Sequence, residues 1–200
     1  MKVKRFIEGP VMTNMYVVSD ENKAGFIVDC AYPSKAVEEY IKKNNIKIKF
    51  ILQTHTHFDH VLGLEHFKNL YKVKAYASED SLSIANDKDY NLAYSYDLKV
   101  DIDEFLKDGE VFSEYNIEAI KTPGHTIDSM SFKVDDMIFS GDTLFKLSIG
   151  RTDFPGGSYP QIIDSIKNKL GGFDKNTIVY PGHGDETYIG YELSNNPFLA

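Results

Sequence analysis

The sequence predicts a mixed α/β fold in which two sheets are covered by helices. Its first residues form short stretches rich in β-branched and aromatic side chains, which are typical of strands. Its middle alternates apolar runs with helical patterns, and its last third returns to apolar runs that end in glycine or proline turns. This order of strands, strand–helix units and strands again favours two sheets.

The first half of the chain is predicted to contain an antiparallel meander followed by alternating helices and strands. The runs that predict strands are residues 3–7, 14–19, 24–29, 49–53 and 73–77. A helix is expected after Ser34, which is suited to cap it, and a second helix over residues 61–70. Residues 86–103 are polar and lack a sustained period, so they predict a long loop with room for a short helix. Three tyrosines of this loop are candidates for a lid over a cleft, namely Tyr90, Tyr94 and Tyr96.

The second half is predicted to return to strands. They are expected at residues 116–121, 130–134, 137–140 and 177–180. A helix over residues 161–170 is favoured because isoleucines share one of its faces, and it ends at Gly171. The tail, residues 186–200, has room for one short helix.

Size and composition predict one globular domain over residues 1–200. With 42% hydrophobic residues the chain can build a core, and no apolar run approaches the roughly 20 residues that span a bilayer. The N-terminus lacks the apolar centre of a signal peptide, so a cytoplasmic location is expected. The net charge of −8, from 30 acidic and 22 basic side chains, opposes phosphate binding. We therefore expect neither nucleic acid nor a membrane as a partner.

Metal-binding side chains are concentrated in residues 54–60, which read Thr-His-Thr-His-Phe-Asp-His. This H-x-H-x-D-H pattern directly follows an apolar run, so a strand is expected to deliver it to a sheet edge. Because Cys30 is the only cysteine, any metal must be held by histidines and carboxylates. His66 lies inside a predicted helix and is expected to be a surface or packing residue.

Three further apolar runs end in a tight turn followed by a metal-binding side chain. These turns deliver His125, Asp142 and His183, and their glycines and prolines let the chain aim the side chain back over the sheet edge. The candidate ligands are therefore His55, His57, Asp59, His60, His125, Asp142 and His183. Such a set is too large for one tetrahedral zinc and suits two metal ions roughly 3.5–4 Å apart. Imidazole and carboxylate ligands suit zinc, iron or manganese.

These residues resemble the metallo-β-lactamase superfamily, and within it the single-domain proteins similar to glyoxalase II (hydroxyacylglutathione hydrolase). The resemblance is carried by Asp29 and by residues 55–60, 124–126, 140–145 and 181–184. It implies a four-layer αββα sandwich with two metal ions in the cleft where the loops of the two sheets meet. The ligand sets that it implies are His55, His57 and His125 for the first metal, Asp59, His60 and His183 for the second, and Asp142 as the bridge. It also implies that Asp29 braces the ligand loop.

The implied reaction is hydrolysis of a small-molecule thioester such as S-lactoylglutathione. Two divalent ions, with zinc expected and iron or manganese as alternatives, lower the pKa of a shared water toward about 7 and so supply a hydroxide. A thiolate leaves without much help from an acid, because the pKa of a thiol is near 8.5. Amide hydrolysis would need a proton donor, for which Asp59 is the catalytic candidate. The oligomeric state is left open by the sequence.

The chain departs from the full-length glyoxalase II pattern in two places. It stops soon after His183, so we expect no C-terminal helical domain that binds glutathione. Arg151 stands where glyoxalase II has a lysine that contacts substrate, and it could either grip a substrate carboxylate or pair with Asp153. The same loop resembles persulfide dioxygenases, in which one iron would use His55, His125 and Asp142. A lactonase-type hydrolase is a further alternative.

Overall fold

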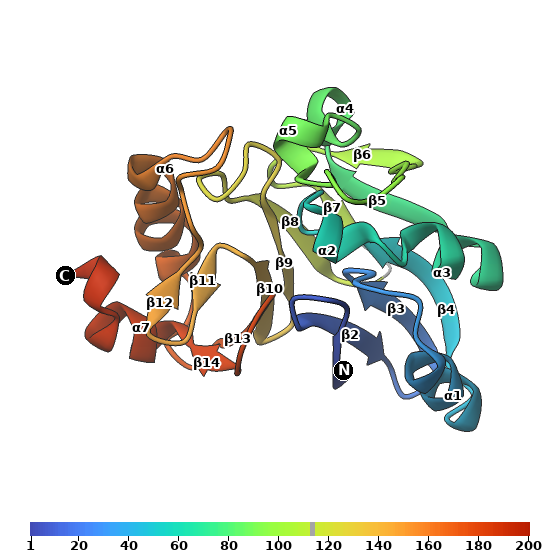
Figure 1. The fold of residues 1–200 in the computed structure, drawn as a ribbon. Helices are drawn as coiled ribbons and strands as arrows, with labels where there is room; N and C mark the ends of the chain where they lie inside the picture. Colours follow the sequence, from blue (N-terminus) through green and yellow to red (C-terminus); the bar gives the residue numbers. More distant parts are fainter. Residues whose placement is uncertain (113–114) are drawn as a thin grey trace.

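The computed structural model describes residues 1–112 and 115–200 and contains two six-stranded sheets (Figure 1). The first sheet has the order β1-β2-β3-β4-β5-β6, and the second has the order β14-β13-β10-β9-β8-β7. Strands β1 to β3 are antiparallel to one another, whereas β3 to β6 run parallel. The predicted N-terminal meander is therefore confirmed.

The strands of the first sheet are β1 (Lys2–Glu8), β2 (Thr13–Ser19), β3 (Ala24–Val28), β4 (Lys47–Leu52), β5 (Lys74–Ser78) and β6 (Glu104–Leu106). Those of the second sheet are β7 (Val111–Phe112), β8 (Ile117–Lys121), β9 (Met130–Val134), β10 (Met137–Gly141), β13 (Ile178–Pro181) and β14 (Thr187–Tyr188). A separate hairpin is formed by β11 (Leu144–Phe145) and β12 (Ser148–Ile149). Every strand predicted from the sequence is present, and the very short strands were not predicted.

The helices that accompany the first sheet are α1 (Lys35–Lys43), α2 (Phe58–Val61), α3 (Leu64–Tyr71), α4 (Ser81–Ile84) and α5 (Lys88–Asn91). Those that follow β12 are α6 (Tyr159–Asp164), a π-helical turn η1 (Ser165–Lys169), η2 (Leu170–Gly172), α7 (Ile189–Asn195) and η3 (Pro197–Leu199). The predicted helix over 61–70 is in fact interrupted at Gly63. There the backbone N–H of Gly63 donates to the carbonyl of Cys30 at 2.8 Å instead of to a carbonyl of the preceding helical turn, and a Cβ would lie 2.7 Å from the backbone of Tyr32, which favours glycine at this position.

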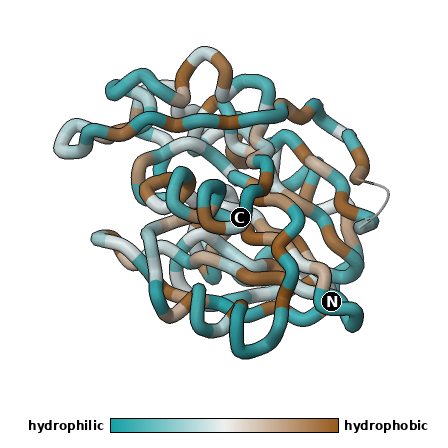
Figure 2. The backbone as a smooth tube through the Cα atoms, turned by 90° about the vertical axis from the view of Figure 1, so that its right-hand side faces the viewer, coloured by the Kyte–Doolittle hydropathy of each residue, from teal (hydrophilic) through white to brown (hydrophobic). Residues whose placement is uncertain are grey.

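Alternating side chains of the strands place the apolar residues in three layers. In β2, Met15 and Val17 pack toward α1 and α3, while Tyr16 and Val18 pack against the second sheet. On the other side of the second sheet, Ile138 packs with residues of α6 and α7. The order helix, sheet, sheet, helix confirms the αββα sandwich (Figure 1). Figure 2 shows hydrophobic and hydrophilic residues alternating along the backbone, as expected for elements with one buried face.

The strand directions bring the predicted ligand turns to one edge of the second sheet. β8 and β10 are each antiparallel to β9, and β13 is parallel to β10, so these three strands end at the same edge. Among the described residues, no helix combines the length and the apolar character needed to cross a membrane.

Candidate metal centre

Seven candidate ligands converge from four strand ends. His55 and His57 follow β4, and Asp59 and His60 lie in the short helix α2 directly after them. The other ligands come from the second sheet. They follow β8, β10 and β13 respectively, and they are His125, Asp142 and His183.

The side chains fall into three overlapping groups whose ligand atoms lie within 4.8 Å of one another. The groups are His55 with His57 and His125, His55 with His60 and Asp142, and Asp59 with His60 and His183. The sequence-predicted residues are thus brought together in the arrangement expected for a metal centre.

Asp142 lies between the two outer groups. Its Oδ1 is 3.4 Å from Nε2 of His60, and its Oδ2 is 3.5 Å from Nε2 of both His125 and His183. Asp59 faces the same region, with Oδ2 lying 3.4 Å from Nε2 of His60 and 3.3 Å from Nε2 of His183. The carboxylate of Asp142 therefore lies near a member of the first group, His125, and a member of the third, His183, as expected of a bridging ligand.

Several of these atoms are buried without a hydrogen-bond partner in the described part of the chain. They are Nε2 of His55, His57 and His60, and Oδ1 of Asp142. Leaving a buried polar atom unpaired costs free energy, so such a cluster needs a partner. Divalent cations bound by imidazole nitrogens and carboxylate oxygens would satisfy it, and the residues therefore fit the metals that the ligand set implies.

Asp29 contacts the ligand loop, the position that the resemblance implied for it. Its Oδ2 accepts a hydrogen bond from Nδ1 of His60 at 2.8 Å and another from the Thr54 hydroxyl at 2.8 Å. Its Oδ1 accepts from the backbone N–H of Thr54 at 2.8 Å. A carboxylate on the far nitrogen of a ligating histidine fixes the ring and leaves the near nitrogen for a metal.

His125 and His55 are held in the same manner by other acceptors. Nδ1 of His125 lies 2.8 Å from the backbone carbonyl of Arg151, so Nε2 faces the cluster. Nδ1 of His55 lies 3.1 Å from the Thr54 hydroxyl. The backbone on either side of the cleft thus sets the ring orientations.

The charges of the cluster shift its pKa values in opposite directions. Burial raises the pKa of Asp142, but the charge of His60, whose Nε2 lies 3.4 Å away, and the charge of His125 outweigh burial and lower the pKa to about 2. Burial, together with the charge of His125, lowers the pKa of His57 to about 3. Burial also lowers the pKa of His60, yet the charges of Asp59, Asp29 and Asp142 raise it well above its usual range. Carboxylates here are ionised at neutral pH, which suits cation binding.

Two glycines allow the loops to approach the cluster closely. A Cβ on Gly182 would lie 2.1 Å from Oδ1 of Asp142 and 2.8 Å from Cε1 of His60. A Cβ on Gly141, whose φ is +51°, would lie 2.4 Å from the Thr54 hydroxyl oxygen. A larger residue at Gly182 would have to displace a ligand, and one at Gly141 would have to displace the side chain of Thr54.

Two supporting residues were not identified from the sequence. Asp128 is buried, and its Oδ2 accepts hydrogen bonds from the hydroxyls of Thr56 at 2.7 Å and Ser81 at 3.0 Å, which fixes the peptide between the first two histidines. Thr13 donates its hydroxyl to Oδ2 of Asp59 at 2.6 Å. Asp128 lies only three positions after the predicted ligand His125, and this closeness could have marked it as a supporting residue. No predicted ligand lies near Thr13 in the sequence.

An open cleft of about 370 Å³ leads to the ligands. Its lining residues other than the ligands are Val11, Phe58, Leu92, Phe145, Ser148, Ile149, Arg151 and Phe154. None of the three tyrosines expected as a lid, Tyr90, Tyr94 and Tyr96, is among the residues that line this cleft. From the predicted loop it is Leu92 that lines the cleft, while Tyr96 stacks on Phe58 at 5.3 Å and Tyr94 hydrogen-bonds to Asp89.

Arg151 makes the ion pair that was one of its two expected roles. Its Nε and Nη2 donate to the two carboxylate oxygens of Asp153 at 2.9 and 2.7 Å, and both side chains are exposed. Its guanidinium lies 4.1 Å from the ring centroid of Phe154, which in turn packs on His57. Arg151 therefore stiffens the loop beside the ligands while its side chain borders the cleft.

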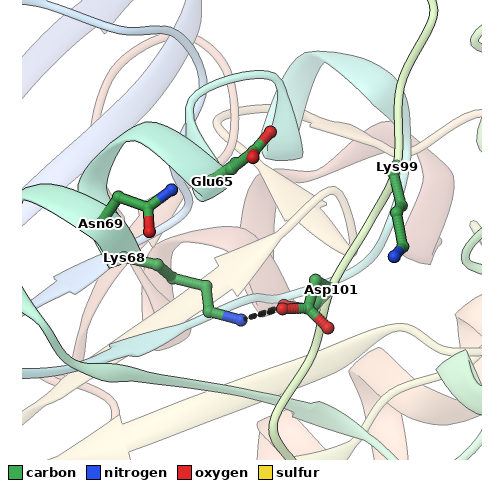
Figure 3. Close-up of a pocket in the computed structure, with 5 residues that line it drawn as sticks. All are labelled: Glu65, Lys68, Asn69, Lys99 and Asp101. Atoms are coloured by element: carbon green, nitrogen blue, oxygen red, sulfur yellow. Dashed lines mark hydrogen bonds and ion pairs between the residues drawn. The ribbon is translucent and has the colours of Figure 1, made fainter.

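A second hollow lies away from the metal-binding cluster, beside α3 (Figure 3). It is lined by Glu65, Lys68, Asn69, Lys99 and Asp101. Lys68 is already paired with Asp101 at 2.8 Å. His66, on the same helix, contacts Glu38 at 2.8 Å, in agreement with its expected packing role.

Comparison with known proteins identifies the family. The sequence pattern of the Metallo-beta-lactamase superfamily matches residues 9–183. The chain belongs to this superfamily. Members of the superfamily bind divalent metals, in agreement with the His and Asp groups described above.

Relatives and solved structures within the superfamily match almost the whole chain. "Hydroxyacylglutathione hydrolase GloC" of Haemophilus influenzae is 33% identical over 93% of this chain and 92% of its own length. "Probable metallo-hydrolase YqgX" of Bacillus subtilis is 31% identical over 100% of this chain and 98% of its own. The BLEG-1 B3 metallo-beta-lactamase has a TM-score of 0.93, 30% identity and full coverage of both chains. TTHA1623 in a di-iron-bound form has a TM-score of 0.88 and 27% identity, covering 98% of this chain and 100% of its own. The chain is thus a metallo-hydrolase of the superfamily.

Proposed function

We propose that the chain is a binuclear metal-dependent hydrolase that cleaves a thioester of the S-lactoylglutathione class. The observation that carries this proposal is the position of Asp142, whose two oxygens face His60 on one side and His125 and His183 on the other. The similarity to GloC of Haemophilus influenzae supports the choice of substrate. The similarity to TTHA1623 in a di-iron-bound form supports a site for two metals.

The proposed ligands of the first metal are His55, His57 and His125, those of the second are Asp59, His60 and His183, and Asp142 is shared. When bound, two divalent ions, zinc or alternatively iron or manganese, would supply a hydroxide near neutral pH and polarise the thioester carbonyl. Asp29, Thr54 and the carbonyl of Arg151 hold the rings so that the ligating nitrogens face one another.

The pKa of Asp59 favours the ligand role over that of a proton donor. Burial raises this pKa, but the charge of His60 and the hydrogen bonds of His183 and Thr13 outweigh burial and place it below the usual range. An ionised Asp59 cannot protonate a leaving amine. It is compatible with a thiolate leaving group, which departs as a stable anion.

The cleft walls provide the remaining contacts with substrate. Phe145, Ile149 and Phe154 form an apolar surface beside the ligands, which excludes water from the reacting carbonyl. We propose that Arg151 contacts a carboxylate of the thiol portion, in competition with Asp153.

The proposal is tested by counting the metals and by measuring hydrolysis of S-lactoylglutathione with the purified protein. We expect about two metal ions per chain and release of free thiol. His183→Ala should lower kcat by at least about 100-fold and leave one metal ion, whereas His66→Ala, which changes a histidine outside the cluster, should change neither. One iron per chain with oxygen uptake on glutathione persulfide, and no thioester hydrolysis, would instead establish the dioxygenase alternative.

A further inference from the structure

Strand β2 contacts the candidate second metal site through a hydroxyl group. The Oγ1 of Thr13 donates to Oδ2 of Asp59 at 2.6 Å, and both residues are buried, with exposed fractions of 0% and 7%. A short hydrogen bond to a charged oxygen in a buried environment is strong and directional. It restricts the orientation of the Asp59 carboxylate.

The oxygen that Thr13 contacts is the one that faces the histidines. Oδ2 of Asp59 lies 3.4 Å from Nε2 of His60 and 3.3 Å from Nε2 of His183. Rotation of the Asp59 carboxylate would turn Oδ2 away from these two histidines and bring Oδ1 into its place. The Thr13 hydroxyl therefore selects which oxygen the group presents.

The position of Thr13 relative to His183 is itself fixed by the next residue of β2. The backbone N–H of Asn14 donates to the carbonyl of Gly182 at 2.7 Å. Its side-chain amide donates to the carbonyls of Pro181 at 2.9 Å and Gly184 at 2.8 Å. Strand β2 of the first sheet is thus joined to the loop that carries His183 in the second.

The group formed by His55, His57 and His125, the proposed first metal site, depends on different contacts. His125 is held by the carbonyl of Arg151, and the peptide between His55 and His57 is held through Thr56 by Asp128. A change at Thr13 is therefore expected to act on one group and to spare the other.

We infer that Thr13 is a positioning residue that sets the affinity of the second metal site by orienting Asp59. This inference rests on the proposed binuclear function. Partners of a ligating side chain typically change metal affinity by about 10–100-fold when they are removed. We therefore expect loss of the hydroxyl to weaken the second equivalent of metal by that factor and to leave the first unchanged.

The test is a titration of the metal-free, full-length protein with Co²⁺, followed by visible absorption. Thr13→Val removes the hydroxyl at nearly constant volume, and Thr13→Ser restores it. Thr187→Val is a matched control, because Thr187 is also buried and donates to a carboxylate, that of Glu192, at 2.5 Å outside the cluster. Thermal unfolding of each metal-free variant reports whether the protein still folds.

The expected result is a selective loss of the second equivalent in Thr13→Val, rescue in Thr13→Ser and no loss in Thr187→Val. If Thr13→Val binds both equivalents of Co²⁺ equally more weakly, or binds both as the unmodified protein does, the role of Thr13 is overturned. The binuclear function would still stand, provided that the unmodified protein binds two equivalents. Failure of the Ser variant to rescue would also overturn it, because the hydroxyl would then not be the cause. If the unmodified protein binds a single equivalent, the binuclear function fails and the inference fails with it.

Discussion

His60 is oriented by Asp29: Nδ1 of the ring lies 2.8 Å from Oδ2 of the carboxylate, and both side chains are buried. Asp29 comes at the end of β3, whereas His60 lies in α2 after β4, so the contact joins two segments of the first sheet. It leaves Nε2 of His60 facing Asp59 and Asp142. A histidine held in this way is a stronger metal ligand than a free one.

Replacing Asp29 with Asn should weaken metal binding by about 10–100-fold, because the amide cannot match the charge that supports His60. Asn is the suitable replacement, since Asp29 has a φ of +56° and Asn tolerates this conformation better than most residues. Zinc affinity measured with a competing chelator checks the effect. Asp20→Asn is the control, because Asp20 is half-buried and also accepts a backbone hydrogen bond, from Ala24 at 2.8 Å, in the turn between β2 and β3. Equal affinities for all three proteins would contradict the role of Asp29.

Gly182→Ala should remove bound metal and activity together. The added Cβ would lie 2.1 Å from Oδ1 of Asp142, so either the ligand or the 181–184 loop must move. Gly172→Ala is the matched control, because a Cβ there has no described atom within 4 Å. Metal content and kcat are the measurements. A fully loaded and active Gly182→Ala protein would show that the loop adopts another path.

The ion pair of Arg151 gives a prediction with two opposite changes. If Arg151 contacts a substrate carboxylate, Asp153→Asn should lower KM for S-lactoylglutathione by releasing the guanidinium, and Arg151→Ala should raise KM by about 10-fold, the effect of about 1.4 kcal/mol. The value of kcat should stay the same in both variants. Neither change should alter stability by more than about 1 kcal/mol, because the pair is exposed. Unchanged KM values would leave only loop stiffening as the role of the pair.

The low pKa of His57, about 3 in the folded protein, predicts that acid destabilises the metal-free form. An unfolded chain takes up this proton near pH 6.5, so between pH 6.5 and about 3 the unfolded state binds more protons than the folded state. The free energy of unfolding therefore decreases as the pH is lowered through this range. His60 and His183 have raised pKa values and act in the opposite sense, since their contribution is lost as pH rises above 6.5.

Thermal unfolding of the metal-free protein at pH 7 and pH 5 measures this effect. We expect His57 to contribute a loss of up to about 2 kcal/mol over this interval. The loss should be smaller in His57→Gln, which has no group that titrates there. An identical loss in both proteins would assign the acid sensitivity to other residues.

The strand ends and the ligands could be predicted from the sequence because both depend on local patterns. Apolar runs followed by glycine or proline turns gave the places of His125, Asp142 and His183, and the H-x-H-x-D-H segment gave the others. The Asp29 contact was expected from resemblance alone, since its partner lies 31 positions away.

The remaining features depend on tertiary contacts that no local pattern encodes. The helical period is interrupted at Gly63 because its backbone N–H donates to the carbonyl of Cys30, 33 positions earlier in the chain. Thr13 reaches Asp59 across 46 positions, and the two-residue strands exist only because neighbouring strands pair with them. Tyr94 contacts Asp89 of its own loop, and Tyr96 stacks on Phe58 beside it. The tyrosine-rich composition of the loop therefore did not reveal which of its residues lines the cleft.

Each of the three ligand groups draws members from both halves of the sandwich. His55, His57, Asp59 and His60 follow the first sheet, and every group completes itself with His125, Asp142 or His183 from the second. Neither half carries a full set, so a metal bound by any group would act as a cross-link between segments far apart in the chain. Metal binding should therefore add to the stability of the contact between the two sheets, beyond the apolar layer that they share.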